Sequence, residues 1–492
     1  MERGGSGGSR GLLLATLAVA LVAIALRAVL FDPYAQFHAD EFYQYLEQGH
    51  RLAEGYGAVP WEWRAGMRNG LIPQFLAPWF ALGAAIAPQG ILPVVLARGA
   101  FAALCLLVLA GAWGIGAATS RRHALAALLI AALWPDGVMF GGDVLSESAA
   151  TALIACGAAL LLADRAPGRR LALAGFLLGL GVLVRLQYAP FIAVLVLFEA
   201  RRDWAVWRGL ALGAALALGL GVVSDLTMHW VPFHWIVANF GQNIGAGRAA
   251  RFSTMGPLAY LAMLLAGLGP FAPLILGLAC FAPRRYRGLQ AAALVNLLAH
   301  SVIAHKEYRF IWLSVLMILV LAAIASVDLL DRWRARRGPD RVAGPGALLA
   351  LCLTWCGISL AALASTHGAA SARGGGAMAM AAHDVAAMPR VCGLAVPLQW
   401  HNYVISAYLR RDVPIYEVPE AVLAGKAPMP AGITLAANAV LGDDRPPAPG
   451  YGKGPCHQYA GEKACLWLRP GMCQSGAAPL FARQAYMNAN DL

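Results

Sequence analysis

The stretch LLLATLAVALVAIALRAVL, residues 12–30, predicts a helix that crosses a lipid bilayer. About 20 apolar residues span ~30 Å of hydrocarbon as a helix, and apolar runs of this kind recur along the chain. Of the 492 residues, 59% are hydrophobic and 13% are charged, whereas a soluble domain has roughly 45–50% and about 25%. The sequence therefore predicts a multi-pass membrane protein. No small-residue cleavage site ends the first run, so we expect it to be retained as the first helix.

Arginines between the apolar runs predict the orientation, because cytoplasmic loops carry an excess of Lys and Arg. We place the N-terminus and five basic loops in the cytoplasm: Arg121-Arg122, Arg165 with Arg169-Arg170, Arg201-Arg202 with Arg208, Arg284-Arg285 with Arg287, and Arg332 to Arg337. The loops left to face the outside are 32–90, 141–148, 185–188, 225–255, 305–308 and everything after about 366. These anchors explain the formal net charge of +12, so we expect no nucleic-acid partner.

Residues 71–88 are apolar, but a crossing there would put Arg121-Arg122 outside. They contain Pro73, Pro78 and Pro88, and we interpret them as an interfacial or re-entrant helix within the first outer loop, 32–90. The fold expected is an all-α polytopic bundle of about eleven crossings. The alternative has about twelve or more, with some basic loops outside.

The composition changes near residue 365. We expect a transmembrane domain over 1–365, a linker over 366–377 and a small α/β domain outside the membrane over 378–492. Short β-type stretches alternate there with Pro/Gly turns, at 390–396, 413–418 and 433–441. Two disulfides fit an oxidising compartment, and the sequence leaves open how they pair four cysteines: Cys392, Cys456, Cys465 and Cys473.

The first outer loop combines acids, aromatic rings and a base in one short polar segment. His38-Ala39-Asp40-Glu41 places two adjacent carboxylates where a membrane helix should emerge. Trp61-Glu62-Trp63 and Arg68 follow. This mixture suits a site that binds a sugar and activates a hydroxyl. The simpler alternative is that the acids only solvate a loop.

A second cluster, His305-Lys306-Glu307-Tyr308-Arg309, lies at a predicted non-cytoplasmic helix end. Its basic groups run against the positive-inside trend, and an anionic ligand such as a lipid phosphate explains them. Arg185 joins it as a predicted phosphate ligand, although it could instead extend to the headgroups. Glu147, Asp225 and Asn239 are candidate substrate-binding residues; the alternative for Glu147 is a role at a helix start, and for Asn239 a capping or bridging role.

Together these clusters predict a transferase with a lipid-carried donor. A carboxylate, Asp40 or Glu41, takes the proton of an acceptor hydroxyl. Lys306, Arg309, His305 and Arg185 hold the departing phosphate, where charge develops. No nucleotide-binding glycine fingerprint occurs in a strand–helix context. We expect the acidic pair and the basic cluster to meet above the same leaflet.

His38-Ala39-Asp40-Glu41-Phe42, with Gly55-Tyr56-Gly57, Trp61-Glu62-Trp63 and Arg68, resembles the first luminal loop of the GT-C mannosyltransferases of family 22. That family includes the mannosyltransferases of the GPI-anchor pathway and the Alg9-type enzymes. His305 to Phe310 is similar to the family motif His-Lys-Glu-x-Arg-Phe, and the resemblance covers about 32–315. Ala39 stands where the family has Pro, and Met67-Arg68 where it has Ile-Arg, so the acceptor and the sugar stay open.

The resemblance implies a GT-C fold, a polyprenyl-phosphate mannose donor, a lipid-linked or glycan acceptor and inversion at the anomeric carbon. It implies membrane lipids as partners and no required metal or other cofactor. It also suggests substrate-binding roles for His38, Trp61, Glu62, Trp63 and Arg68, and it favours Glu41 over Asp40 as the base. The Ala/Gly/Arg-rich composition is typical of bacteria, which predicts the inner membrane and a periplasmic site. A eukaryotic chain would have its site in the lumen of the endoplasmic reticulum.

Three alternatives remain at this point. A transporter or flippase of lipid-linked sugars would place its charges at mid-membrane and show internal repeats. An assembly or receptor protein would bind glycans without catalysis, which leaves the paired acids without a role. A GT-C enzyme could also use another lipid-linked sugar.

Overall fold

The computed structural model describes residues 6–163, 168–336, 344–366, 374–397, 403–423 and 426–490. Arg165, Arg337 and the predicted linker positions 367–373 lie outside these ranges. The chain divides into two compact units. The first unit comprises Met1–Phe31, Ala102–Gly142 and Ser146–Gly368, and the second comprises Asp32–Phe101, Asp143–Leu145 and Ala369–Leu492.

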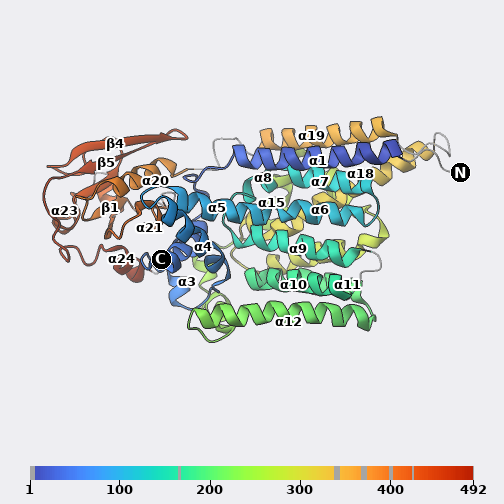
Figure 1. Ribbon diagram of the computed structural model, residues 1–492, viewed down its shortest axis with the longest axis horizontal. Coiled ribbons are helices and arrows are strands. Elements are labelled where there is room, and N and C mark those ends of the chain that lie inside the picture. The colour runs from blue at the N-terminus through green and yellow to red at the C-terminus, as the bar shows by residue number, and fades with distance from the viewer. Residues whose placement is uncertain are drawn as a thin grey trace. The chain divides into compact units, whose positions relative to one another are not determined.

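The first unit is a bundle of helices (Figure 1). Its first half contains α1 (Ser6–Val29), α6 (Leu107–Ala117), α7 (Arg121–Leu133), α8 (Pro135–Phe140), α9 (Ser146–Leu162), α10 (Gly168–Val184), η2 (Leu186–Tyr188), α11 (Ala189–Ala200) and α12 (Trp204–Thr227). Its second half contains α13 (His234–Phe240), η3 (Gly241–Gly245), α14 (Ala249–Phe252), α15 (Ala259–Leu268), η4 (Gly269–Phe271), α16 (Ala272–Cys280), η5 (Arg284–Tyr286), α17 (Arg287–Val302), η6 (Tyr308–Ile311), α18 (Trp312–Ala335) and α19 (Pro345–Thr366).

Six helical segments among the described residues are long and apolar enough to cross a membrane. They are Arg10–Val29, Leu92–Ala117, Trp204–Thr227, Ala259–Cys280, Tyr308–Ala335 and Pro345–Ser365. Shorter apolar helices cover Leu71–Ile86, Ser146–Leu162 and Leu186–Ala200. The segment Tyr308–Ala335 is almost entirely buried, which makes α18 the central helix of the bundle.

Small residues let neighbouring helices of the bundle approach closely. Helices α7, α6, α9, α10 and α12 follow one another side by side (Figure 1). A Cβ atom added to Gly213 on α12 would lie 1.8 Å from the carbonyl oxygen of Ala172, and one added to Gly175 on α10 would lie 2.1 Å from that of Leu210. Close backbone contact through glycine is typical of membrane helices, which gain little from hydrophobic burial against lipid.

The second unit begins with the outer segment that follows α1. Its elements are the π-helical segment η1 (Asp40–Leu46), α2 (Glu47–Glu54), α3 (Trp61–Arg64), α4 (Leu71–Ile86) and α5 (Leu92–Cys105, as far as Phe101). Helix α4, expected to be interfacial or re-entrant, packs on α2 of this unit. Gly49 makes this packing possible, because an added Cβ would lie 2.8 Å from the side chain of Leu76.

The rest of the second unit is a small α/β fold, as expected. It contains α20 (Gly376–His383), η7 (Asp384–Ala387), β1 (Leu394–Pro397), α21 (Ser406–Leu409), β2 (Ile415–Val418), α22 (Glu420–Leu423), α23 (Ala431–Ala436), β3 (Ala439–Gly442), β4 (Gly452–Tyr459), β5 (Glu462–Leu468) and α24 (Arg483–Ala489). The strand order is β2-β1-β3-β5-β4. β1 is parallel to β2 and β3, and β5 is antiparallel to β3 and β4.

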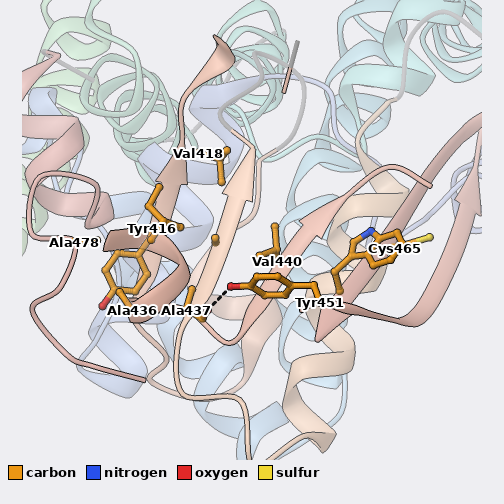
Figure 2. Packing of buried hydrophobic residues seen from close by; sticks show 11 residues of the cluster. Tyr416, Val418, Ala436, Ala437, Val440, Tyr451, Cys465 and Ala478 are labelled. Atoms are coloured by element: carbon orange, nitrogen blue, oxygen red, sulfur yellow. Dashed lines mark hydrogen bonds between the residues drawn. The ribbon is translucent and has the colours of Figure 1, made fainter. Parts of the chain in front are cut away.

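Buried aromatic and aliphatic side chains fill the core of this sheet (Figure 2). The Tyr451 hydroxyl donates to the carbonyl oxygen of Ala437 at 2.6 Å, which satisfies its polar end inside the core. The hairpin between β4 and β5 turns at Ala460 and Gly461, both with positive φ, as two-residue hairpin turns require. Disulfides join Cys392 to Cys473 and Cys456 to Cys465, which settles the pairing that the sequence left open.

Two expectations about this part need correction. Residues 433–436 belong to α23 and not to a strand, and β1 starts at Leu394 and not at Arg390. Residues 32–101 form one compact unit with the C-terminal domain. This unit is held together by contacts between residues that are far apart in the sequence. Glu47 accepts hydrogen bonds from the backbone and the hydroxyl of Ser406, each at 2.8 Å.

Candidate active site

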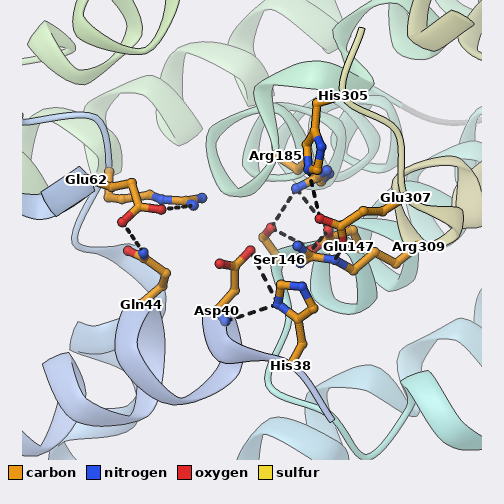
Figure 3. Close-up of polar contacts among 11 residues, drawn as sticks. His38, Asp40, Gln44, Glu62, Ser146, Glu147, Arg185, His305, Glu307 and Arg309 are labelled. Atoms are coloured by element: carbon orange, nitrogen blue, oxygen red, sulfur yellow. Dashed lines mark hydrogen bonds and ion pairs between the residues drawn. The ribbon is translucent and has the colours of Figure 1, made fainter. Parts of the chain in front are cut away.

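The predicted site residues fall into two clusters, one in each unit. The acidic cluster belongs to the second unit and is built on η1, whose π-helical turn begins at Asp40. Such turns are rare and often occur at functional sites. The Nδ1 atom of His38 accepts from the backbone N–H of Asp40 at 3.1 Å and lies 3.8 Å from its carboxylate (Figure 3). The Asp40 side chain is 22% exposed, so its carboxylate is accessible.

Glu41, the next residue, has a different environment. Its side chain is fully buried, and Oε1 accepts from Nη2 of Arg98 at 2.9 Å and from the backbone N–H of Val144 at 3.0 Å. Arg98 also donates to the carbonyl oxygens of Pro33 and Ala35. Glu41 is therefore tied to Arg98 and Val144 inside the unit, and which of the two acids acts as the base stays a prediction.

Glu62 lies near Asp40 and interacts with it. Its Oε2 accepts from the amide of Gln44, and its Oε1 lies 3.5 Å from the guanidinium of Arg68 (Figure 3). Burial raises the pKa of Glu62, Arg68 opposes this shift, and the nearby Asp40 carboxylate adds to it. Trp61 and Trp63, expected to contact the substrate, are buried in the core of the unit. Glu62 thus interacts with both Asp40 and Arg68.

The basic cluster belongs to the first unit and contains a network of alternating charges in which Glu147, Arg185 and Arg309 are buried (Figure 3). Glu147, in the first turn of α9, has Oε1 at 3.2 Å from Arg185 and 3.0 Å from Arg309. Arg309 also bonds Glu307 at 2.6 Å, and Glu307 bonds His305 at 2.9 Å. Ser146 links Glu147 and Arg185, at 3.0 and 3.1 Å. Predicted residues distant in sequence are therefore neighbours here.

Lys306 is buried beside this network. Its ammonium donates to the carbonyl oxygens of Ile303 and, at 3.2 Å, Met255, and it lies 5.8 Å from the ring of Tyr260. An ammonium has three donors, so one N–H remains for another acceptor. The cluster contains three basic side chains, Lys306, Arg185 and Arg309, and two carboxylates bonded to the arginines, Glu147 and Glu307. Basic side chains thus outnumber the carboxylates in this cluster, which suits an anion.

Two other predicted residues bond elsewhere. Asp225, at the end of α12, accepts from the backbone N–H of Phe233 at 2.7 Å and closes the turn after the helix. The side-chain oxygen of Asn239 accepts from the amide of Asn243 at 3.2 Å. Both contacts indicate local structural roles.

Sequence reasoning missed Arg98 and Asp136. Asp136, in α8, accepts from the hydroxyl of Tyr308 at 2.7 Å and from Nε1 of Trp134 at 3.2 Å. A charged residue inside an apolar run is costly unless paired or functional, and this signal marks both residues. Among the described residues, the candidate metal group of His, Cys and acidic side chains is Asp444, Cys456 and Cys465. Its cysteines form a disulfide and offer no thiolate.

The fold is similar to that of known membrane glycosyltransferases. ArnT from Cupriavidus metallidurans, in a crystal structure with bound undecaprenyl phosphate, superposes with a TM-score of 0.55 at 16% identity, over 84% of this chain and 86% of that one. The oligosaccharyltransferase of Archaeoglobus fulgidus gives a TM-score of 0.53 at 14% identity, over 87% and 68%. The chain therefore has the GT-C fold, which confirms the fold class predicted from the sequence, whereas the count of about eleven crossings stays a prediction.

The Alg9-like mannosyltransferase family model matches residues 16–408, and the chain belongs to this family. Sequence relatives include GPI mannosyltransferase 3 of Yarrowia lipolytica, 44% identical over 61 residues, or 12% of this chain and 11% of the relative. Mannosyltransferase APTG1 of Arabidopsis thaliana is 39% identical over 71 residues, or 14% and 12%. The matched segments thus cover about a tenth of these relatives. The match of the family model confirms the resemblance to family 22.

Proposed function

We propose that this protein is a mannosyltransferase that moves a mannosyl residue from a polyprenyl-phosphate donor to a hydroxyl of a lipid-linked or glycan acceptor. Membership of the Alg9-like mannosyltransferase family supports the sugar. The fold shared with ArnT, which binds undecaprenyl phosphate, supports a lipid-linked donor. The observation that carries the proposal is the buried cluster of Arg185, Lys306 and Arg309, in which basic side chains outnumber the carboxylates.

In the proposed reaction, the acceptor oxygen forms a bond to the anomeric carbon of mannose from the face opposite the phosphate. The bond between that carbon and the phosphate oxygen breaks, and its electron pair leaves with the phosphate. Asp40 takes the hydroxyl proton as general base. The cations of the basic cluster stabilise the charge that develops on the phosphate. Attack from the opposite face inverts the anomeric carbon.

Asp40 is preferred over Glu41 because of its surroundings. Glu41 is buried and neutralised by Arg98, whereas Asp40 is partly exposed at the start of η1. Glu62 and Arg68 lie beside Asp40 and would orient the acceptor hydroxyls. The proposal requires both clusters to act on one donor molecule, and variants in each cluster test this separately.

We place the reaction on the non-cytoplasmic side, in the periplasm of a bacterial inner membrane or the lumen of the endoplasmic reticulum. The disulfides Cys392–Cys473 and Cys456–Cys465 support this side, because disulfides persist in oxidising compartments. The distribution of arginines among the loops agrees with it.

The experiment uses purified protein in liposomes with a labelled synthetic polyprenyl-phosphate mannose and a mixture of glycolipid acceptors. Transfer of label by the wild type, and its loss in Asp40→Asn and in Arg309→Gln, is the expected result. Asp444→Asn is a matched control, because this exposed acid pairs with Lys453 and Lys463 at the sheet. Movement of the donor across the bilayer without a new glycosidic bond would show a transporter instead. Full transfer by both site variants would refute the proposed roles.

A further inference from the structure

In the segment between the spans α12 and α15, residues 228–258, large apolar side chains are more exposed than neighbouring polar ones. Its helix α13 continues directly into η3. Val237, Phe240 and Ile244 are 70%, 52% and 68% exposed. Their spacing of three and four residues places them on one face. The polar side chains of Gln242 and Asn243 are only partly exposed.

Large apolar side chains exposed together mark a surface that contacts lipid or protein. The bilayer is the occupant that fits this surface, because the segment connects two membrane spans. On α12, which precedes the segment, Leu220, Val223 and Leu226 are exposed as well. Large exposed apolar side chains thus occur both on the membrane span and on the segment that follows it.

Charge points to the same occupant. Arg248 and Arg251 follow the apolar helix and precede the next span. A helix that lies in a membrane interface combines an apolar face with Lys or Arg that contacts lipid phosphates. A water-exposed loop has no need for three large apolar side chains on one face.

The same segment holds part of the basic cluster. The Ser253 hydroxyl bonds Nδ1 of His305 at 2.9 Å, and the backbone N–H of Met255 donates to the carbonyl oxygen of Ala304 at 3.0 Å. Lys306 donates to the carbonyl oxygen of Met255. The depth at which the segment lies in the membrane would therefore fix the height of His305 and Lys306.

We propose that residues 231–258 lie in the interface of the bilayer, with Val237, Phe240 and Ile244 inserted at the level where headgroups meet acyl chains. The insertion fixes the basic cluster at headgroup height on that side of the membrane. This inference rests on the exposed apolar face of the segment and on the hydrogen bonds that Ser253 and Met255 of the same segment form with His305 and Lys306. It holds whichever sugar the protein transfers.

A depth measurement tests the insertion. In a chain whose five free cysteines are replaced, one cysteine is introduced as Val237→Cys, Ile244→Cys or the matched control Gln242→Cys, and labelled with an environment-sensitive fluorophore. In nanodiscs with anionic phospholipid, shallow doxyl-labelled lipids should quench the first two labels several-fold more than the control. Equal quenching at all three positions would overturn the proposal. Labels at 237 and 244 shielded from both lipid and aqueous quenchers would also overturn it, and would show a protein partner.

A second measurement uses the unmodified protein and so does not depend on the folding of variants. A phospholipid with a photoactivatable group near its headgroup is incorporated into the same nanodiscs and activated. Mass spectrometry should find the label on the peptide that contains 237–244. Labelling restricted to the membrane spans, with none on this peptide, would overturn the inference.

Discussion

Replacing the two adjacent acids of the outer loop should separate stability from catalysis. Glu41→Gln removes the negative charge from a buried ion pair and leaves the Arg98 guanidinium without its counter-ion. Loss of one partner of a buried pair costs about 3–5 kcal/mol. Asp40→Asn changes a partly exposed group of the same shape, and such changes usually cost less than about 0.5 kcal/mol.

The rate of mannose transfer should fall more in Asp40→Asn than in Glu41→Gln, which is the reverse of their effects on stability. Without its general base, Asp40→Asn should lose about 10²–10⁴-fold in kcat. Glu41→Gln, measured at a temperature where it is folded, should stay within about tenfold of the wild type, because Glu41 acts through the loop and not on the substrate. The assay combines thermal unfolding followed by intrinsic fluorescence with labelled mannose transfer on the same preparations.

A double-mutant cycle provides the control. Arg98→Met alone leaves the Glu41 carboxylate buried without its partner, and combination with Glu41→Gln should recover part of the lost stability. A stable Glu41→Gln variant without transfer, together with an active Asp40→Asn variant, would refute the reasoning and return the role of base to Glu41.

Further predictions concern other contacts. Arg483→Met leaves the carboxylate of Glu417 buried and unpaired, so thermal unfolding should show a loss of about 3–5 kcal/mol; a loss below about 1 kcal/mol would contradict the buried pair. Burial lowers the pKa of His50 to about 3, so the folded state stays neutral while the unfolded state gains a proton below about pH 6.5. Stability should therefore fall by about 2 kcal/mol more between pH 7 and 5 in the wild type than in His50→Asn, and equal acid sensitivity of the two chains would refute this. Tyr308→Phe removes the hydroxyl that donates to Asp136, and denaturant unfolding should show a loss of about 1.5–3 kcal/mol; an unchanged midpoint would show that this bond contributes nothing.

The sequence predicted the features that depend on local pattern. Apolar runs predicted the membrane class, and the motifs at 38–41 and 305–310 predicted the family, both of which are confirmed. Unusual charge at a helix end also pointed to Arg309 and Glu147, which the fold brings within 3.0 Å. The expectation that the acidic pair and the basic cluster serve one donor stays a prediction.

What the sequence could not predict depends on contacts between distant residues. Arg98 and Glu41 are 57 positions apart, and nothing local distinguishes a neutralised acid from an accessible one. The union of the outer loop with the C-terminal domain depends on bonds such as that from Ser406 to Glu47, 359 positions apart. Strand limits near Ala439 were misplaced because the apolar residues before it suit a helix and a strand equally well.

The lipid-linked donor is the basis of the proposed function, and a comparison of two donors shows whether the protein uses it. Purified protein in liposomes receives labelled polyprenyl-phosphate mannose in one arm and labelled GDP-mannose in the other, and the glycosidic product is analysed for its anomeric configuration. We expect transfer from the lipid donor alone, with inversion at the anomeric carbon of mannose. Transfer from GDP-mannose, or a product that retains the configuration of the donor, would contradict it.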